Sequence, residues 1–241
     1  MDASMIVGLV GLAGSGKGTV ADYFVSKYGF DKHSFASPIK DITSTLFGWD
    51  RALLEGDTEK SRNFREKKQG KYSPREVLQK IGTECFRDTF NSNFWVDSLE
   101  SRLDISKNIV IADVRFKNEM DWILKNKGRL LWVTRENEPE WFMNLIDEDN
   151  PVKPKKKEVH PSEWEWTQHD WFLKRHWDFD YDTRKFKFGY RIDNTSDLKA
   201  LYKAVKELIE YFWEEEKLLP LGHNRTNKKR LKKSERNRQY Y

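Results

Sequence analysis

Residues 5–19 read Met-Ile-Val-Gly-Leu-Val-Gly-Leu-Ala-Gly-Ser-Gly-Lys-Gly-Thr, an apolar run that leads into a glycine-rich loop. The frame of two glycines with four residues between them, followed by lysine, is complete from Gly11 to Gly16 and Lys17. Glycines at these positions let backbone N–H groups close around phosphate oxygens. The apolar run predicts a buried strand, and the loop predicts a following helix whose N-terminus favours an anion. The stretch therefore predicts a nucleotide-phosphate site at the end of a strand.

The loop carries the groups expected around a nucleoside triphosphate. Lys17 would reach the β- and γ-phosphates, and Thr19 would support Mg²⁺ directly or through water. The hydroxyl comes one place later than in the common pattern, because Gly18 precedes Thr19. The candidate ATP-binding residues of the loop are Gly14, Ser15, Gly16, Lys17, Gly18 and Thr19.

Further along the chain, apolar runs alternate with amphipathic stretches. Apolar runs at 108–112 and 129–134 enclose a helical pattern at 116–124, which predicts two parallel strands joined by a right-handed crossover. Alternation over 186–192 predicts one more strand. The other expected helices begin at Lys17, at Ser37, at the capping box Ser73-Pro74-Arg75-Glu76 and at Leu198. These elements predict an α/β fold with a central parallel sheet flanked by helices.

Asp113 ends the apolar run at 108–112, where a magnesium-binding acid is expected in such a fold. Arg115 follows two residues later. Side chains two apart on a strand point the same way, so both are expected to face the crevice at the carboxyl end of the sheet. Asp113 and Thr19 are thus the candidate ligands of Mg²⁺, and Arg115 is a candidate phosphate-binding residue. Together with Lys17, Asp113 and Arg115 are the candidate catalytic residues.

Charge is distributed unevenly along the chain. The net charge is +5, but residues 222–241 hold eight Lys and Arg against one acid, so this tail carries +7 and residues 1–221 carry −2. A nearly neutral body is not typical of a basic nucleic-acid-binding domain. We expect the tail to be a solvated terminus, with contact to nucleic acid as the alternative.

Cys85 is the single cysteine of the chain, so no internal disulfide is available, which suits a reducing cytosol. Because it lies in an apolar helical pattern, we expect it to be buried. No run of about 18 apolar residues is present, so no transmembrane helix and no membrane partner are expected. The N-terminus lacks the basic and cleavage features of a signal peptide. These features predict a cytoplasmic protein.

Several segments together resemble the bacteriophage-type deoxynucleoside monophosphate (dNMP) kinases, which are P-loop enzymes. Gly-Lys-Gly-Thr at 16–19 is a version of the loop that nucleoside monophosphate kinases often carry. The resemblance extends over most of residues 5–210 and depends on the order and spacing of its segments. Beyond the loop, the matching segments are 35–41, 73–83, 93–96, 113–120, the strand ending at Arg135, 160–163 and 192–194.

The resemblance implies transfer of a phosphate from ATP to a dNMP, giving dNDP and ADP, with Mg²⁺ as cofactor. It places Asn194 beside ATP and implies the host cytoplasm if the chain is phage-encoded. It leaves open whether the protein forms a homodimer. The acceptor-site residues that it implies are Lys40, Arg75, Gly82, Thr83, Trp95, Arg115 and Glu119.

On this resemblance, residues 1–221 form the P-loop kinase domain and 222–241 a basic C-terminal tail. An acceptor-binding helical part is expected at about 50–100, in which the polar stretch 50–72 predicts a mobile surface segment. A lid-like, substrate-binding insertion is expected at about 136–185. The candidate lid residues are Arg135, His160, Arg175 and Arg184.

Two other functions stay open. A P-loop kinase for another small acceptor, such as dephospho-coenzyme A, would use the same core, because a fold does not determine its substrate. A nucleic-acid-associated P-loop protein would use the basic tail. Two departures bear on base selectivity and on the lid: some relatives carry basic residues where this chain has Ala13 and Gly14, and the stretch 136–182 is longer and more aromatic.

Overall fold

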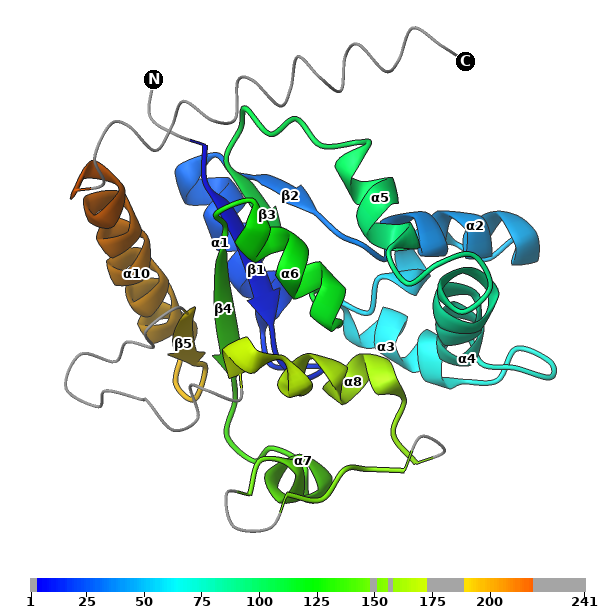
Figure 1. The fold of residues 1–241 in the computed structure, drawn as a ribbon. Coiled ribbons are helices and arrows are strands. Elements are labelled where there is room, and N and C mark those ends of the chain that lie inside the picture. The colour runs from blue at the N-terminus through cyan, green and yellow to red at the C-terminus, as the bar shows by residue number, and fades with distance from the viewer. Residues whose placement is uncertain (1–3, 148–150, 156–157, 173–188, 219–241) are drawn as a thin grey trace, which may run out of the picture.

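The computed structural model describes residues 4–147, 151–155, 158–172 and 189–218. A five-stranded sheet with the strand order β2-β3-β1-β4-β5 forms its centre, and every neighbouring pair is parallel (Figure 1). The strands are β1 (Ile6–Val10), β2 (Asp31–His33), β3 (Ile109–Ile111), β4 (Arg129–Thr134) and β5 (Gly189–Asp193). The predicted α/β fold with a parallel sheet is confirmed. The short strand β2 was not predicted, because its sequence Asp-Lys-His is polar.

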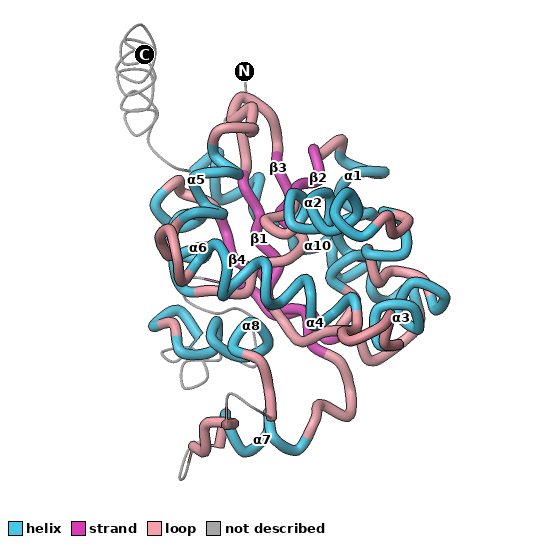
Figure 2. The backbone as a smooth tube through the Cα atoms, turned by 90° about the vertical axis from the view of Figure 1, so that its right-hand side faces the viewer, coloured by secondary structure: helices cyan, strands magenta, loops and turns pink. Residues whose placement is uncertain are grey.

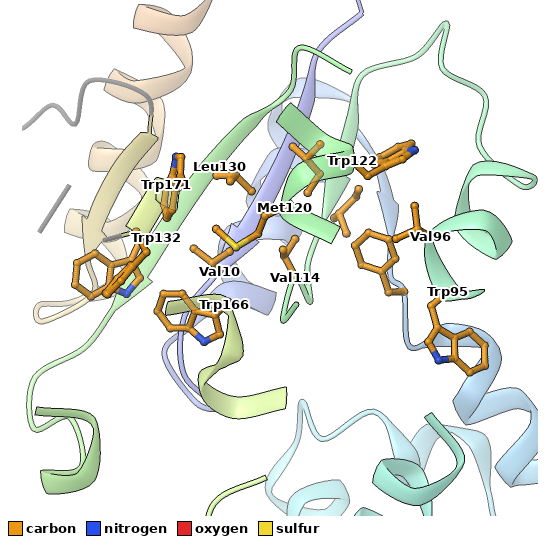
Figure 3. Packing of buried hydrophobic residues seen from close by; sticks show 14 of the residues in the cluster. Val10, Trp95, Val96, Val114, Met120, Trp122, Leu130, Trp132, Trp166 and Trp171 are labelled. Carbon is orange, nitrogen blue, oxygen red and sulfur yellow. The ribbon is translucent and has the colours of Figure 1, made fainter. Parts of the chain in front are cut away.

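Helices cover both faces of the sheet, since successive strand residues point to opposite faces and both sets are apolar. Val7 and Leu9 of β1 pack with α1 and α10, whereas Ile6 and Val10 pack with α6. Figure 3 shows the second of these cores. The α-helices are α1 (Lys17–Tyr28), α2 (Ser37–Phe47), α3 (Glu59–Glu66), α4 (Pro74–Gln79), α5 (Phe94–Glu100), α6 (Lys117–Lys125), α7 (Glu140–Leu145), α8 (Pro161–Trp164) and α10 (Leu198–Leu218).

Gly8, in the middle of β1, allows α6 to approach the sheet closely. A Cβ at this position would collide with Cδ1 of Ile123 and would also crowd Leu130 and Val114. These three side chains belong to the core between the sheet and α6. Glycine therefore sets the distance between β1 and this helix.

The short helix α8 lies across the carboxyl ends of the strands, at the lower edge of the sheet in Figure 1. Trp166, in the helical turn that follows α8, is 1% exposed and lies near the ring of Trp132 on β4. It also makes an edge contact with Phe172. Figures 1 and 2 place α3 and α4 beside the same edge. This packing holds α8 near the loop that follows β1.

The expectation of a mobile surface segment at 50–72 missed the regular structure of this largely exposed stretch. A helical turn at Arg51–Leu54 and helix α3 occupy most of it, and Leu54 is fully buried. Thr58 starts α3 with a capping box in which Ser61 is the partner. Apolar anchors such as Leu54 are few in this stretch, so its composition did not reveal the helix.

The expectation that Cys85 is buried is also wrong, because this cysteine is exposed. The predicted capping box of Ser73 and Glu76 is confirmed, but the helix that it starts continues after Gln79 as a π-helix over Lys80–Arg87. The wider turn changes which side chains face inward. Thr83 and Arg87 are buried in place of Cys85.

Several predicted features lie partly or wholly outside the described residues. The strand expected over 186–192 is described from Gly189 onward. The tail at 222–241 and the candidate lid residues Arg175 and Arg184 are not among the described residues. Within the described part of the chain, no helix has the length and apolar character needed to cross a bilayer.

Candidate active site

The glycine loop runs from the end of β1 into α1, as the sequence predicted. Gly16, at the N-terminus of α1, has φ of 103°, a left-handed conformation that favours glycine. A Cβ at Gly16 would also collide with Nδ2 of Asn194. The Asn194 amide donates a hydrogen bond to the Ser15 carbonyl at 2.9 Å. The structure therefore brings Asn194, which follows β5, into direct contact with the loop.

Lys17 lies across the mouth of the loop. Its Nζ donates hydrogen bonds to the carbonyls of Gly11 at 2.8 Å and Leu12 at 2.7 Å, and the residue is 8% exposed. Burial, with a smaller effect from the positive charge of Arg115, lowers the pKa of Lys17 to about 7. The opposing effects come from the carboxylates of Glu163, Asp113 and Glu138. The charges of both Asp113 and Arg115 therefore act on the Lys17 ammonium.

Asp113 makes contacts that its place at the end of an apolar run did not predict. Its Oδ2 accepts hydrogen bonds from the Ser34 hydroxyl at 2.6 Å and the Ala36 N–H at 2.9 Å. Its Oδ1 accepts one from the Phe35 N–H at 2.9 Å. Because these groups precede α2, the carboxylate stabilises the N-terminus of that helix. Asp113 therefore connects the end of β3 to the start of α2.

The residues present are compatible with Mg²⁺. The Thr19 hydroxyl and the Asp113 carboxylate are hard oxygen donors of the type that Mg²⁺ takes. Oδ1 of Asp113 accepts a hydrogen bond from the Phe35 N–H and has a further lone pair for a water of the metal shell. Among the described residues, no group of three or more His, Cys, Asp and Glu could form a complete metal site. Phosphate oxygens and water would therefore supply most ligands, as is usual for Mg²⁺ at phosphates.

Two of the predicted acceptor residues converge on one carboxylate of α8. Nη1 of Arg115 lies 3.0 Å from Oε1 of Glu163, and Nη1 of Arg75 lies 3.7 Å from the same oxygen. Arg115 also donates a hydrogen bond to the Ser162 carbonyl at 3.0 Å. The sequence did not single out Glu163, although it lies within the matching segment 160–163. An anion thus occupies the place between the two arginines where a phosphate was expected.

A third arginine, Arg65 of α3, belongs to this cluster and was missed. Burial, then repulsion by Arg75 and Arg115, lowers the pKa of Arg65 to about 10, against smaller attraction by Glu66 and Glu163. Its Nη1 donates a hydrogen bond to the Glu55 carbonyl at 3.2 Å. Its Nε is buried, and no acceptor for it is found among the described residues. Arg65 lies in a polar stretch among many other charged residues, so no pattern in the sequence distinguished it.

Other predicted acceptor residues form the walls of this region. Trp95 is 3% exposed, and its Nε1 donates a hydrogen bond to the Gly82 carbonyl at 2.7 Å. Gly82 lies against Ile39 of α2, and Thr83 is 8% exposed. Lys40 pairs with Glu55 at 2.5 Å. Direct contact of these residues with the acceptor stays a prediction.

Glu119 is buried behind Arg115 and holds it in place. Its Oε2 accepts hydrogen bonds from the backbone N–H groups of Arg115 at 2.7 Å and Phe116 at 3.1 Å. Its Oε1 accepts one from Arg87 at 2.9 Å, and the Arg87 guanidinium stacks on the Phe116 ring. Burial raises the pKa of Glu119, and Arg87 opposes that shift. This geometry supports Arg115 through its backbone, whereas the resemblance implied a direct contact with substrate.

Comparison with known proteins identifies the family of this chain. The model of the family described as deoxynucleotide monophosphate kinase matches residues 49–149, a stretch that contains Arg65, Arg75, Asp113 and Arg115. A curated protein of Acanthamoeba polyphaga mimivirus, with the same kinase in its name, is 32% identical over 149 residues. That match covers 54% of this chain and 74% of the viral protein. The chain belongs to the deoxynucleotide monophosphate kinase family.

Solved structures that match this member of the family have low sequence identity to it. A dephospho-CoA kinase from Campylobacter jejuni is 15% identical with a TM-score of 0.43, over 87% of this chain and 98% of that one. A shikimate kinase from Aquifex aeolicus is 12% identical with a TM-score of 0.39, over 89% and 99% of the two chains. Because the TM-scores and identities are low, these two structures identify neither the acceptor nor the site residues of this dNMP kinase.

Two candidate lid residues of this dNMP kinase are described. Nη1 of Arg135, which follows β4, donates a hydrogen bond to the Gly14 carbonyl of the loop at 3.2 Å. Nδ1 of His160 accepts a hydrogen bond from the Ser162 N–H at 3.2 Å and thereby caps α8. Arg135 thus lies beside the glycine loop, and His160 caps the start of the helix that carries Glu163.

Proposed function

We propose that this kinase transfers the γ-phosphate of ATP to the phosphate of a dNMP, with the roles divided between two sides of one site. The loop residues from Gly14 to Thr19, with Asn194, hold ATP. Arg75 and Arg115 hold the acceptor phosphate. The observation that carries this assignment is the convergence of both arginines on a single carboxylate beside Lys17.

The chemistry needs little from the protein beyond alignment and charge neutralisation. A monophosphate has a second pKa of about 6, so the attacking oxygen is largely ionised at neutral pH and no general base is required. Lys17 and Arg115 would neutralise the negative charge that is spread over the transferring group. When bound by Thr19 and by a water held on Asp113, Mg²⁺ would supply further positive charge at the phosphates. The remaining residues position the two phosphates in line.

A coupled ADP-release assay with a panel of acceptors tests this function. The panel contains dAMP, dCMP, dGMP, dTMP, the matching ribonucleotides and dephospho-coenzyme A, each with ATP and Mg²⁺. We expect ADP release that requires at least one dNMP. Release with dephospho-coenzyme A alone would assign the other small-acceptor function, and release with no acceptor on the panel would contradict both.

We expect ATP binding to take up protons at mildly alkaline pH, because the pKa of Lys17 is about 7 in the free protein. Triphosphate oxygens next to Nζ favour its charged form and raise that pKa. The bound state then holds more protons, so ATP affinity should fall as pH rises above about 7. Titration calorimetry at pH 8, in buffers of different ionisation enthalpy, measures this uptake. Lys17→Met should abolish the uptake, and wild-type binding without it would contradict the lowered pKa.

A further inference from the structure

Four cationic side chains surround the carboxylate of Glu163. Arg115 and Arg75 lie 3.0 and 3.7 Å from its Oε1, and the charges of Lys17 and Arg65 act on the same region. The Glu163 side chain is 15% exposed, and those of Arg115 and Arg75 are 26% and 30% exposed. Like charges repel strongly at such partly buried positions, so a cluster of this kind needs an anion at its centre.

The other nearby carboxylates make their hydrogen bonds to other groups, and Glu119 binds Arg87 and the backbone N–H of Arg115. Glu66 pairs with Nε of Arg75, and its side chain is 58% exposed. Asp113 binds the groups that precede α2. The buried Nε of Arg65 has no acceptor among the residues that the structure describes. Glu163 is therefore the main counter-ion of Arg115, and among the described residues the buried Nε of Arg65 is a donor that no carboxylate satisfies.

A phosphate would satisfy this cluster better than a carboxylate does. It carries up to two negative charges and three acceptor oxygens, and guanidinium groups bind it with paired hydrogen bonds. It could take the contacts of Arg115 and Arg75 that Glu163 now holds. The single carboxylate thus marks the centre of a phosphate-binding site.

We propose that the Glu163 carboxylate occupies the position of the acceptor phosphate, and that the dNMP must displace it in order to bind. This inference rests on the proposed function, because it requires that the acceptor ends in a phosphate. Glu163 is then an internal competitor of the substrate. Without acceptor it neutralises Arg115, and when it is displaced Arg115 and Arg75 become available to the nucleotide.

The packing around α8 restricts how this exchange takes place. Trp166, three residues beyond Glu163, is 1% exposed against Trp132 and Phe172. His160 caps the other end of the short helix. The helix is therefore fixed at both ends, and the exchange requires a rotation of the Glu163 side chain.

The neutral variant Glu163→Gln tests the proposal. Glutamine keeps the size of the side chain and removes the charge that competes for the arginines. We expect dNMP binding to tighten about tenfold, the ratio that corresponds to one charge-assisted hydrogen bond. In kinetics the KM for the dNMP should fall while kcat stays within a few-fold. The measurements are calorimetric titration and steady-state ADP release, with the dNMP that gives the fastest wild-type turnover.

Glu158→Gln is the matched control, since Glu158 is exposed, precedes the same helix and pairs only weakly with Lys155 at 3.8 Å. It changes the net charge equally and should leave dNMP binding unaltered. If Glu163→Gln does not fold, Glu163→Asp keeps the charge but withdraws it from Arg115, and it should also tighten binding.

Unchanged or weaker dNMP binding in both Glu163 variants would overturn the proposal. Weaker binding would show that the carboxylate orients the arginines for the substrate. The experiments can contradict the proposed function and the role of Glu163 independently. A wild-type protein without dNMP-dependent ADP release contradicts the proposed function. An active wild type whose Glu163 variants do not bind dNMP more tightly contradicts only the role of Glu163.

Discussion

Lys17→Ala leaves the fold intact and lowers kcat by about 10²–10³-fold or more, in line with loss of other preorganised charge stabilisers. The hydrogen bonds of Nζ go to two loop carbonyls, so their loss does not disturb the packing of the sheet. In the reaction the same ammonium is expected to bind the transferring phosphate. The measurement is kcat in the coupled assay, together with the melting temperature.

Lys27→Ala is the control for this experiment, because Lys27 is an exposed lysine in the last turn of the same helix. It should leave both kcat and the melting temperature close to wild type. A folded Lys17→Ala protein with near wild-type turnover would remove the basis for the phosphate-binding loop.

Arg115→Lys lowers kcat/KM for the dNMP by about 10²-fold while ATP binding changes little. Lysine cannot reproduce the planar fork that binds a phosphate with two hydrogen bonds. The estimate corresponds to loss of one strong charge-assisted contact in a partly buried site. Nucleotide affinity is measured by titration, and turnover is measured across dNMP concentrations.

Two checks separate the chemistry of Arg115 from its structural contacts. Arg115 also binds the Ser162 carbonyl, so the melting temperature of the variant must be measured as well. Arg62→Lys, at an exposed arginine of α3, is the matched control and should have no effect on turnover. If Arg115→Lys weakens ATP binding and spares the response to dNMP, Arg115 belongs to the ATP side.

The sequence predicted those parts of the fold that depend on short-range patterns. The loop after β1 is recognised from the spacing of its glycines. β3, α6 and β4 each show a hydrophobic pattern within about a dozen residues. The π-helix over Lys80–Arg87 has no such signal, because one wider turn changes the inward face without any change in composition. Cys85 was therefore assigned to the wrong side of its helix.

The site was predicted less completely because its contacts join distant parts of the chain. Asp113 binds Ser34 across 79 residues, and Arg115 reaches Ser162 across 47. The sequence indicated that Asp113 and Arg115 share a strand end, but not that one holds α2 and the other faces Glu163. Arg65 is one charged residue among many in a polar stretch, and only folding brings it to Arg75 and Arg115.

The exposed thiol of Cys85 makes this protein suitable for single-site labelling. The chain has no other cysteine, so a maleimide or spin label would attach at one position without further mutagenesis. The label would sit on the outer side of the π-helix whose inner side carries Gly82 and Thr83. A fluorescence or resonance signal from this position could follow dNMP binding in real time in the otherwise unmodified enzyme.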